Sequence, residues 1–261
     1  MPTLEPSNAT QAAQLLLAVR RGAPRLAALP GALAPQDLAE AYAIQFEVLR
    51  ELGADVGGWK ASLFDAANGI CAPLAAGAIL DAPAYLLPER KPTLNTTQYG
   101  IEPEIAFRLG QDLPALASGA RYERAAVCAA IVSAHAVIEV VVSRYLDWNA
   151  VSQLERVADS FMNELLIVGP SVPAWQQLAL ANLPLEVRVD GTTVYRGRGG
   201  HPLGDPLLPL VWLANHLGQQ GRGLRAGEFV TTGSCNGLRT VAPEQTVSAY
   251  FTGLGTAVIT F

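Results

Sequence analysis

Ile101-Glu102-Pro103-Glu104-Ile105-Ala106-Phe107-Arg108-Leu109 is the stretch in which apolar and polar residues alternate most cleanly. Its odd-numbered residues are all apolar, whereas its even-numbered residues include Glu102, Glu104 and Arg108. Successive side chains of a strand point to opposite faces, so the stretch predicts a strand with one buried face. Pro103 has no backbone N–H to donate, which predicts that the strand lies at an edge or a bulge.

The two glutamates of this strand point to the same face because they lie two residues apart. Their backbones are separated by roughly 6 to 7 Å, so the two carboxylates can converge on one ligand. For this pair alone, a plain solvated strand face is the alternative explanation. A third carboxylate is needed to decide between the two.

Glu139 supplies that carboxylate from a second apolar stretch, Val137-Ile138-Glu139-Val140-Val141-Val142, whose β-branched residues predict burial on both faces. A buried carboxylate is costly without a cation. Three partners fit: Arg144, Arg108, or a metal ion shared with the first two glutamates. A site of carboxylates alone favours Mg²⁺, Mn²⁺ or Ca²⁺ over zinc. No ligand spacing relates the chain's three histidines, which are His135, His201 and His216.

Two further residues are candidates for acid–base chemistry. Lys60 follows Gly57-Gly58-Trp59, where a backbone without bulk can bring a lysine close to a ligand. Such a lysine can move a proton or pair with a substrate carboxylate, and an ordinary exposed lysine is the alternative. Asp159 can instead be a helix N-cap or a turn residue.

The rest of the chain predicts a single α+β domain over residues 1–261. Residues 1–53 form its N-terminal helical segment, and residues 54–261 form a β-rich core around a mixed, largely antiparallel sheet. Residues 54–100 are expected to hold short strands and long loops. The predicted helices are 9–22, 36–52 (with Pro35 just inside its start and Gly53 past its end), 122–136 and 207–217. The predicted strands are 101–109, 137–145, 165–168, 228–232, 246–251, 256–261 and the hairpin of 185–189 and 192–196 around Asp190-Gly191.

Composition narrows the possible partners. The net charge is −5 and the basic residues form only short groups such as Arg90-Lys91, so nucleic acid is not expected to bind. Three widely spaced cysteines give neither a disulfide framework nor a metal knuckle. The first residues lack a basic segment followed by an apolar run, and polar residues interrupt the apolar tract 125–142. A cytoplasmic location without membrane insertion is therefore expected.

Several short segments, in this order, resemble one enzyme family. They are Tyr42-Ala43-Ile44-Gln45, Gly58-Trp59-Lys60, residues 101–107, residues 138–144, Leu203-Gly204-Asp205-Pro206 and residues 227–234. Together they resemble the hydratase/decarboxylase branch of the fumarylacetoacetate hydrolase superfamily, whose best-known members are 2-keto-4-pentenoate hydratases. The resemblance covers most of the chain.

The resemblance implies a β-roll core, a homo-oligomer that can associate with a related pathway enzyme, and a small unsaturated 2-keto acid as substrate. It implies Mg²⁺ or Mn²⁺ as the cofactor, held by Glu102, Glu104 and Glu139, and water addition across the substrate's C=C bond. The residues that it places in catalysis are Lys60 and, less directly, Asp159. Those that it places in substrate binding are Lys60, Ser160, Thr232, Gly233 and Ser234.

The sequence also departs from the family pattern. Lys60-Ala61-Ser62-Leu63-Phe64 replaces a Lys-Ile-Gly-Leu-Thr string, and Pro73-Leu74-Ala75-Ala76-Gly77 lacks the acidic residue of a Pro-Asp-Tyr-Gly element. Ser160 stands where an asparagine is common. Fine substrate preference is therefore open.

Two other functions remain possible beside the hydratase. One is decarboxylation of a 4-oxalocrotonate-like dicarboxylate, which Trp59 favours, whereas residues 231–234 favour the hydratase. The other is a non-catalytic partner subunit, which the missing acidic residue suggests. A carbon–carbon hydrolase of the acylpyruvate type fits less well, because those relatives use a Glu/His pair and no histidine precedes His135.

Overall fold

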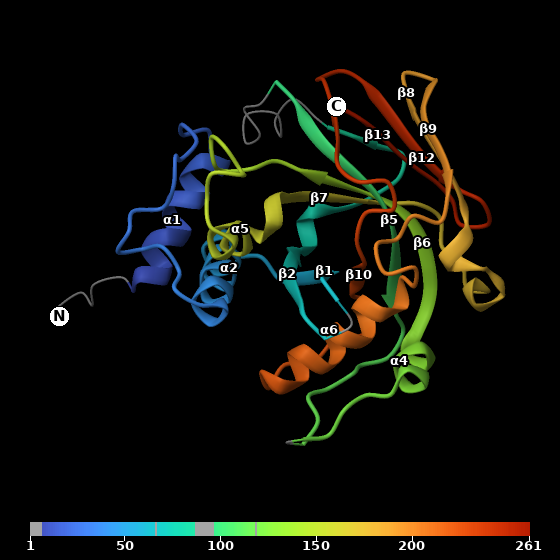
Figure 1. Cartoon of the computed structure of the whole chain (residues 1–261), viewed down its shortest axis with the longest axis horizontal. Coiled ribbons are helices and arrows are strands. Elements are labelled where there is room, and N and C mark those ends of the chain that lie inside the picture. The colour runs from blue at the N-terminus through green and yellow to red at the C-terminus, as the bar shows by residue number, and fades with distance from the viewer. Residues whose placement is uncertain (1–6, 66, 87–96, 118) are drawn as a thin grey trace.

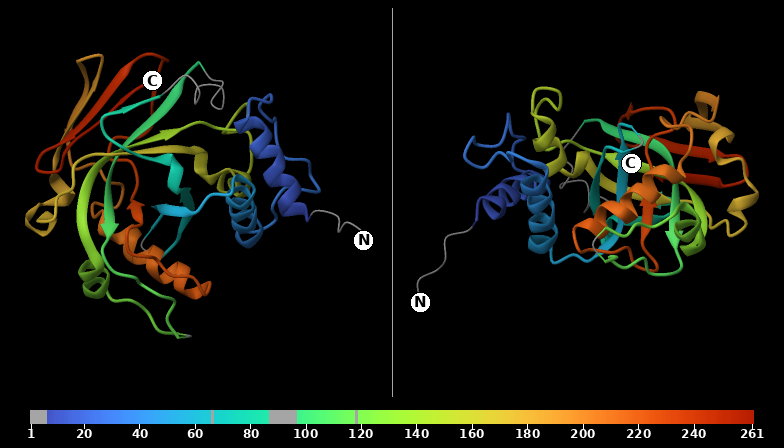
Figure 2. Two further views of the ribbon diagram at one scale, coloured as in Figure 1. Left: turned by 180° about the vertical axis from the view of Figure 1, so that it is seen from behind. Right: turned by 60° about the horizontal axis from the view of Figure 1, so that its bottom comes forward.

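The computed structural model describes residues 7–65, 67–86, 97–117 and 119–261. Two β-sheets form its core, and the N-terminal helices lie together at one end of the molecule (Figures 1 and 2). The first six residues and the Arg90-Lys91 pair lie outside the described residues. The predicted α+β fold with an N-terminal helical segment is confirmed.

The larger sheet has eight strands. Its order is β2 (Gly69–Ala75), β1 (Val56–Leu63), β10 (Phe229–Thr231), β5 (Tyr99–Leu109), β6 (Ile131–Val141), β7 (Asn163–Val168) and β3 (Ile79–Asp81), and β11 (Arg239–Val241) also pairs with β5. The strand predicted at 101–109 is therefore β5, extended by two residues at its start. β5 and β6 are the longest strands, and Figure 1 shows β6 curving around the middle of the molecule.

The smaller sheet has five strands and packs against β6 and β7. Its order is β4 (Ala84–Tyr85), β13 (Gly255–Thr260), β12 (Thr246–Phe251), β8 (Pro184–Val189) and β9 (Thr192–Arg198). The predicted hairpin turn is confirmed at Asp190-Gly191, where both residues have positive φ, as a tight two-residue turn requires. Among the described strands, only β1–β10, β3–β7 and β4–β13 pair in parallel, so the sheets are largely antiparallel.

The N-terminal helices are α1 (Asn8–Arg20) and α2 (Leu38–Leu52). Asp37 caps α2 by accepting a hydrogen bond from the backbone of Glu40, so the helix begins later than predicted and Pro35 lies outside it. Gly53 ends α2 in the left-handed conformation, as predicted. The Gln45 amide donates to the carbonyls of Cys71 at 3.2 Å and Val157 at 2.5 Å, which fastens α2 to the core.

The prediction for residues 122–136 is wrong in its second half. The helix α4 (Arg124–Ala130) ends at Ala130, and the next residue begins β6. Residues 131–136 pair with β5, so backbone hydrogen bonds and burial outweigh the helical propensity of the alanines. The strand predicted to reach Tyr145 also ends early, at Val141, and a turn follows in which the backbone of Tyr145 donates to the Ser143 hydroxyl.

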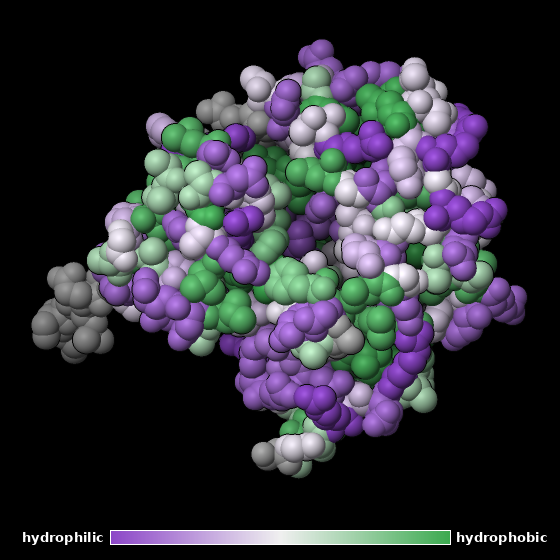
Figure 3. All heavy atoms as spheres, in the orientation of Figure 1, coloured by the Kyte–Doolittle hydropathy of each residue, from purple (hydrophilic) through white to green (hydrophobic). Residues whose placement is uncertain are grey.

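The remaining elements are short apart from α6 (Leu207–Gln219), which agrees with the helix predicted at 207–217. They are α5 (Gln153–Ala158) and the 3-10 turns η1 (Ala76–Ala78), η3 (Ser160–Met162), η4 (Trp175–Gln177) and η5 (Leu180–Asn182). No helix of the described chain is long and apolar enough to span a membrane. On the face drawn in Figure 3, hydrophobic residues form small groups between hydrophilic ones.

The close pairing of β1 with β10 generates a first prediction. A Cβ atom on Gly58 would lie 2.5 Å from the carbonyl oxygen of Phe229, so Gly58→Ala forces the two strands apart. We expect this variant to lose about 1 to 3 kcal/mol in its free energy of unfolding, measured by urea denaturation. Gly31→Ala is the matched control, because nothing lies within 4 Å of that position. A Gly58→Ala variant as stable as the wild type would contradict the pairing.

Candidate metal and substrate site

The structure brings the three predicted glutamates together on one face of the larger sheet. Glu139 of β6 lies directly opposite Glu102 of β5, and Glu104 is two residues further along. One carboxylate oxygen from each lies within 4.8 Å of those from the other two. Glu104 and Glu139 are 2% and 0% exposed, and Glu102 is partly buried. The face is therefore not a plain solvated strand surface.

The cation beside Glu139 is Lys60, not Arg144 or Arg108. The Lys60 Nζ lies 2.8 Å from Glu139 Oε1, and the lysine side chain is 11% exposed, so it is not an ordinary exposed lysine. Three strand spacings separate β1 from β6, which is about 14 Å in a flat sheet. The contact therefore depends on the curvature of the sheet as well as on the length of the lysine side chain.

Glu139 is also held by Asn163, and its two oxygens differ in their surroundings. The Asn163 amide donates to Oε1 at 2.7 Å, on the same oxygen that Lys60 approaches. The other oxygen, Oε2, is buried and has no hydrogen-bond partner among the described residues. A buried carboxylate oxygen without a partner is costly and calls for a ligand.

Glu104 is held by the last residue of β10 and by the segment that follows this strand. The Thr231 hydroxyl and the Gly233 backbone N–H both donate to Glu104 Oε2, the latter at 2.8 Å. Gly233 has φ 112°, a conformation that disfavours any residue with a side chain. Thr231 was not among the predicted site residues. Strand alternation could have identified it, because Thr231 and Thr232 must face opposite sides of the sheet and only one of them can face Glu104.

The other residues predicted for substrate binding have different surroundings. The Thr232 hydroxyl donates to the carbonyl of Ile105 at 2.8 Å, and the residue is 1% exposed. The Ser234 hydroxyl donates to the carbonyl of Gly237 at 3.1 Å. The Thr232 hydroxyl is therefore engaged by the backbone of β5, and of these predicted residues Gly233 contacts Glu104 through its backbone N–H.

Pro103 fits a gap in the sheet rather than its outer edge. β10 covers residues 106–108 of β5 and β11 covers residues 99–101, so neither strand pairs with the stretch between them. The chain crosses this gap, and the Cys235 backbone N–H donates to the Pro103 carbonyl at 2.9 Å. The missing N–H of proline therefore breaks no ladder between these strands.

Asp159 is not placed with the glutamates by any contact. It is the C-cap of α5 through its backbone N–H, which donates to the Glu155 carbonyl, but its side chain caps no helix. Its carboxylate accepts instead from the Nε and the backbone N–H of Arg144. Ser160, buried, and the next two residues have φ values of 51°, 48° and 63°. Each left-handed residue costs about 1 to 2 kcal/mol. The carbonyl of Phe161 in this turn accepts from Lys60 Nζ at 3.2 Å.

Burial and crowding shift the pKa values of the cluster. Burial, with Glu139 and Glu102 nearby, raises the pKa of Glu104 to about 8. Burial and Glu139 also raise the pKa of Glu102, although Lys60 opposes the shift. Burial alone would lower the pKa of Lys60, but the three carboxylates together raise it above its ordinary value. Three carboxylates facing one ammonium leave an excess of negative charge.

These observations test whether a hard divalent cation fits the site. All three donors are carboxylate oxygens, which Mg²⁺, Mn²⁺ and Ca²⁺ prefer. Glu139 Oε2 lacks a partner, and the raised pKa of Glu104 shows that its charge is poorly compensated. The residues present therefore fit such an ion.

The side of the cluster toward β2 is apolar. Leu74 pairs with Gly58 and so shares the face of Lys60, and it packs with Ala106, Val137 and Leu166. Leu74, in β2, belongs to the segment in which the sequence lacks an acidic residue. The structure thus places hydrocarbon beside the carboxylates in this part of the site.

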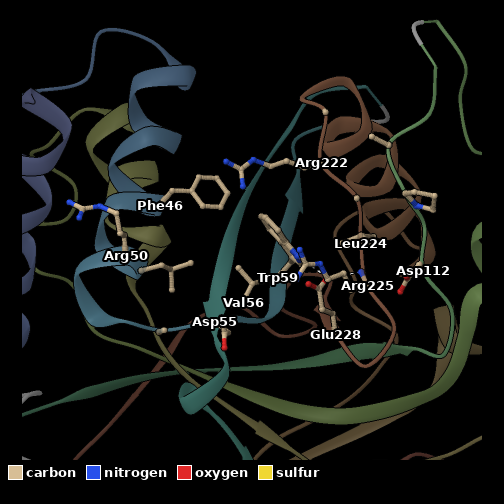
Figure 4. A pocket seen from close by; sticks show the side chains of 16 residues that line it. Phe46, Arg50, Asp55, Val56, Trp59, Asp112, Arg222, Leu224, Arg225 and Glu228 are labelled. Carbon is tan, nitrogen blue, oxygen red and sulfur yellow. Dashed lines mark hydrogen bonds between the residues drawn. The ribbon is translucent and has the colours of Figure 1, made fainter.

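Trp59 lies on the opposite face of β1 from Lys60. Its indole N–H donates to Glu228 at 3.1 Å, and its ring lines a cleft of about 660 Å³ between α2 and the segment before β10. Figure 4 shows Trp59, Phe46 and Arg222 meeting in this cleft. The Trp59 side chain therefore lies on the face of β1 that is turned away from the carboxylate cluster.

Comparisons with known proteins agree on one family. The family model described as fumarylacetoacetate (FAA) hydrolase C-terminal matches residues 73–261. A 2-keto-4-pentenoate hydratase of Paraburkholderia xenovorans is 30% identical over 97% of this chain and 94% of its own length. One of Burkholderia vietnamiensis is 33% identical over 71% of this chain and 69% of its own. The 4-oxalocrotonate decarboxylase from Pseudomonas putida G7, complexed with magnesium and adipate, superposes with a TM-score of 0.83 at 23% identity, covering 99% of both chains.

The raised pKa of Glu104 generates a prediction about stability without metal. The ordinary carboxyl value is 4.5 and the folded value about 8, so the folded state binds the proton more tightly than the unfolded state. Its contribution to stability is complete below pH 4.5 and is lost as pH rises through 8. In chelator, we expect the melting temperature of the wild type to fall over this range relative to Glu104→Gln.

Added Mg²⁺ should reverse this loss, because metal binding requires deprotonated carboxylates. The increase in melting temperature on adding Mg²⁺ should therefore be larger at pH 8 than at pH 5 in the wild type and absent in the variant. Parallel pH profiles of wild type and variant in chelator would show that Glu104 titrates normally.

Proposed function

Because the chain belongs to the fumarylacetoacetate hydrolase family, we propose that it is a metal-dependent hydro-lyase that adds water to the C=C bond of a small unsaturated 2-keto acid. One observation supports this most: three carboxylates, two of them buried, and Lys60 share one face of a curved sheet. The names of the relatives, 2-keto-4-pentenoate hydratases that align with nearly the whole chain, support the same reaction.

Glu102, Glu104 and Glu139 would hold Mg²⁺ or Mn²⁺. Such an ion supplies a Lewis acid that stabilises negative charge developing on a chelated 2-oxo acid. Thr231 and the Gly233 N–H orient Glu104, and Asn163 orients Glu139, so each carboxylate keeps one defined direction. The apolar group around Leu74 excludes water from one side of the cluster.

Lys60 is the proposed proton carrier. An ammonium group has three N–H donors, and two of them are engaged by Glu139 and the Phe161 carbonyl. The third can donate to a substrate oxygen or pass a proton to carbon during water addition. Ser160, Gly233 and Ser234 are retained as proposed substrate contacts, with Thr232 acting through its backbone. A homo-oligomer is proposed from the family resemblance.

The rival on the same scaffold is decarboxylation of an oxalocrotonate-like dicarboxylate. The superposition with a 4-oxalocrotonate decarboxylase over both whole chains favours it. In the described parts of the chain, however, Lys60 is the one cation in contact with the cluster, so a second substrate carboxylate has no matching charge there. This favours a substrate with one carboxylate.

The reaction can be tested with purified protein and Mg²⁺ or Mn²⁺. We expect the ultraviolet absorbance of 2-hydroxypenta-2,4-dienoate to disappear as water adds to the diene, with no release of carbon dioxide. Carbon dioxide from 4-oxalocrotonate without hydration of the dienoate would assign the decarboxylase. No turnover of either compound would favour a non-catalytic partner subunit.

The metal site can be tested separately through Glu139→Gln. The variant keeps the shape of the side chain but loses one ligand charge, so Mn²⁺ affinity should fall by about 100-fold or more while the circular dichroism spectrum is unchanged. Glu186→Gln, in β8 of the smaller sheet, is the control and should bind Mn²⁺ as the wild type does. Unchanged Mn²⁺ affinity in Glu139→Gln, measured by titration calorimetry, would rule out Glu139 as a ligand.

A further inference from the structure

The turn from Ser160 to Met162 is held in a conformation that its residues disfavour. Three consecutive non-glycine residues have positive φ between the end of α5 and the start of β7. Left-handed residues normally occur singly, and such strain persists only where surrounding contacts over-determine it. The contacts around this turn therefore identify what holds it.

Arg144 bonds the residue before the turn and the residue after it. Its Nη2 donates to the carbonyl of Asp159 at 2.8 Å and to the carbonyl of Asn163 at 3.2 Å. Its Nε and backbone N–H donate to the Asp159 carboxylate, the latter at 3.0 Å. Arg144 and Asp159 side chains are each 2% exposed. One guanidinium thus bonds both ends of the turn. We call Arg144, together with the residues that bind it, the clamp.

Two further residues complete the clamp. Glu164 accepts from Arg144 Nη1 at 3.0 Å and from Arg20 of α1 at 2.7 Å. Arg20 also donates to the Asn163 carbonyl at 2.8 Å. The charges of the two arginines are balanced by those of Asp159 and Glu164, so this largely buried network is neutral.

The clamped residues are those that touch the candidate site. The Phe161 carbonyl, inside the turn, accepts from Lys60 Nζ at 3.2 Å. The Asn163 amide, just after it, donates to Glu139 at 2.7 Å. Opening the turn would move both groups away from the Lys60 and Glu139 pair.

We propose that Arg144 is a positioning residue, which holds the strained turn closed so that the Phe161 carbonyl and the Asn163 amide fix Lys60 and Glu139. Asp159 is then the anchor of Arg144 and not a proton carrier. The catalytic consequence rests on the proposed function, whereas the control of Lys60 by the turn does not.

Arg144→Lys tests this, because an ammonium keeps the charge beside Asp159 but lacks the planar fork that reaches both carbonyls. In the folded variant, kcat should fall about 10- to 100-fold while KM stays within about threefold, since a misplaced group slows chemistry more than binding.

The accessibility of Lys60 gives a second measurement. Lys60 is one of two lysines in the chain, so its acetylation by an amine-reactive reagent can be measured on its own peptide. In metal-free protein, Lys60 should react several-fold faster in Arg144→Lys than in the wild type.

Relief of the strain should rescue the variant. Glycine adopts positive φ without a steric cost, so Met162→Gly in the Arg144→Lys background should restore part of kcat and slow the acetylation of Lys60. A merely structural ion pair would not be rescued in this way. Arg188→Lys, an exposed arginine paired with Glu186, is the control and should leave both measurements unchanged.

Wild-type kcat and Lys60 reactivity in a folded Arg144→Lys protein would overturn the proposal, as would failure of Met162→Gly to restore either. If Arg144→Lys does not fold, Arg20→Lys removes one bond to Asn163 from a partly exposed position and should give smaller changes of the same sign. If the wild type turns over neither substrate, the proposed function fails, while the acetylation measurements still decide on the clamp.

Discussion

The contact between Lys60 and Glu139 is the constraint on which the rest of the structure depends. A fully buried glutamate with two buried or half-buried neighbours of the same charge is unfavourable unless a cation reaches it. That cation comes from β1, three strands away, so the sheet must curve until the two sides face one another. The curvature in turn needs close strand pairing, which Gly58 permits by leaving room for the Phe229 carbonyl.

The N-terminal helices also support the contact between Lys60 and Glu139. Arg20 of α1 bonds Asn163, whose amide bonds Glu139, and Gln45 of α2 ties the end of α5 to β2. α5 leads directly into the left-handed turn that meets Lys60. The helical segment is therefore connected to the carboxylate cluster through hydrogen bonds, although its residues lie far from the cluster in sequence.

Local patterns in the sequence predicted the parts of the fold that depend on local periodicity. Alternation located β5, and the Asp190-Gly191 pair located its hairpin, because both signals lie within a few residues. The same patterns failed at residues 131–136, where alanine-rich sequence joins a strand only because β5 supplies partners.

The three glutamates were predictable as a set, since two share a strand face and the third lies in an apolar strand. The partner of Glu139 was not, because Lys60 reaches it through the curvature of the sheet. Thr231 and the contact of Asp159 with Arg144 were not foreseen for a similar reason: side-chain direction and long-range ion pairs are set by tertiary packing.

A divalent cation in the carboxylate cluster would also change the protonation of Lys60. Glu102, Glu104 and Glu139 together raise the pKa of Lys60, and no acidic residue of β2 adds to them, because Leu74 occupies the neighbouring position on that face. Compensating the three carboxylates with a divalent cation removes the charge that favours the protonated ammonium, while burial continues to disfavour it. Occupancy of the cluster by such an ion would therefore lower the pKa of Lys60. A chain with an acidic residue in place of Leu74 would retain a negative charge beside Lys60 after metal binding. With Leu74 at this position, the proton transfer proposed for Lys60 would depend on the occupancy of the carboxylate cluster alone.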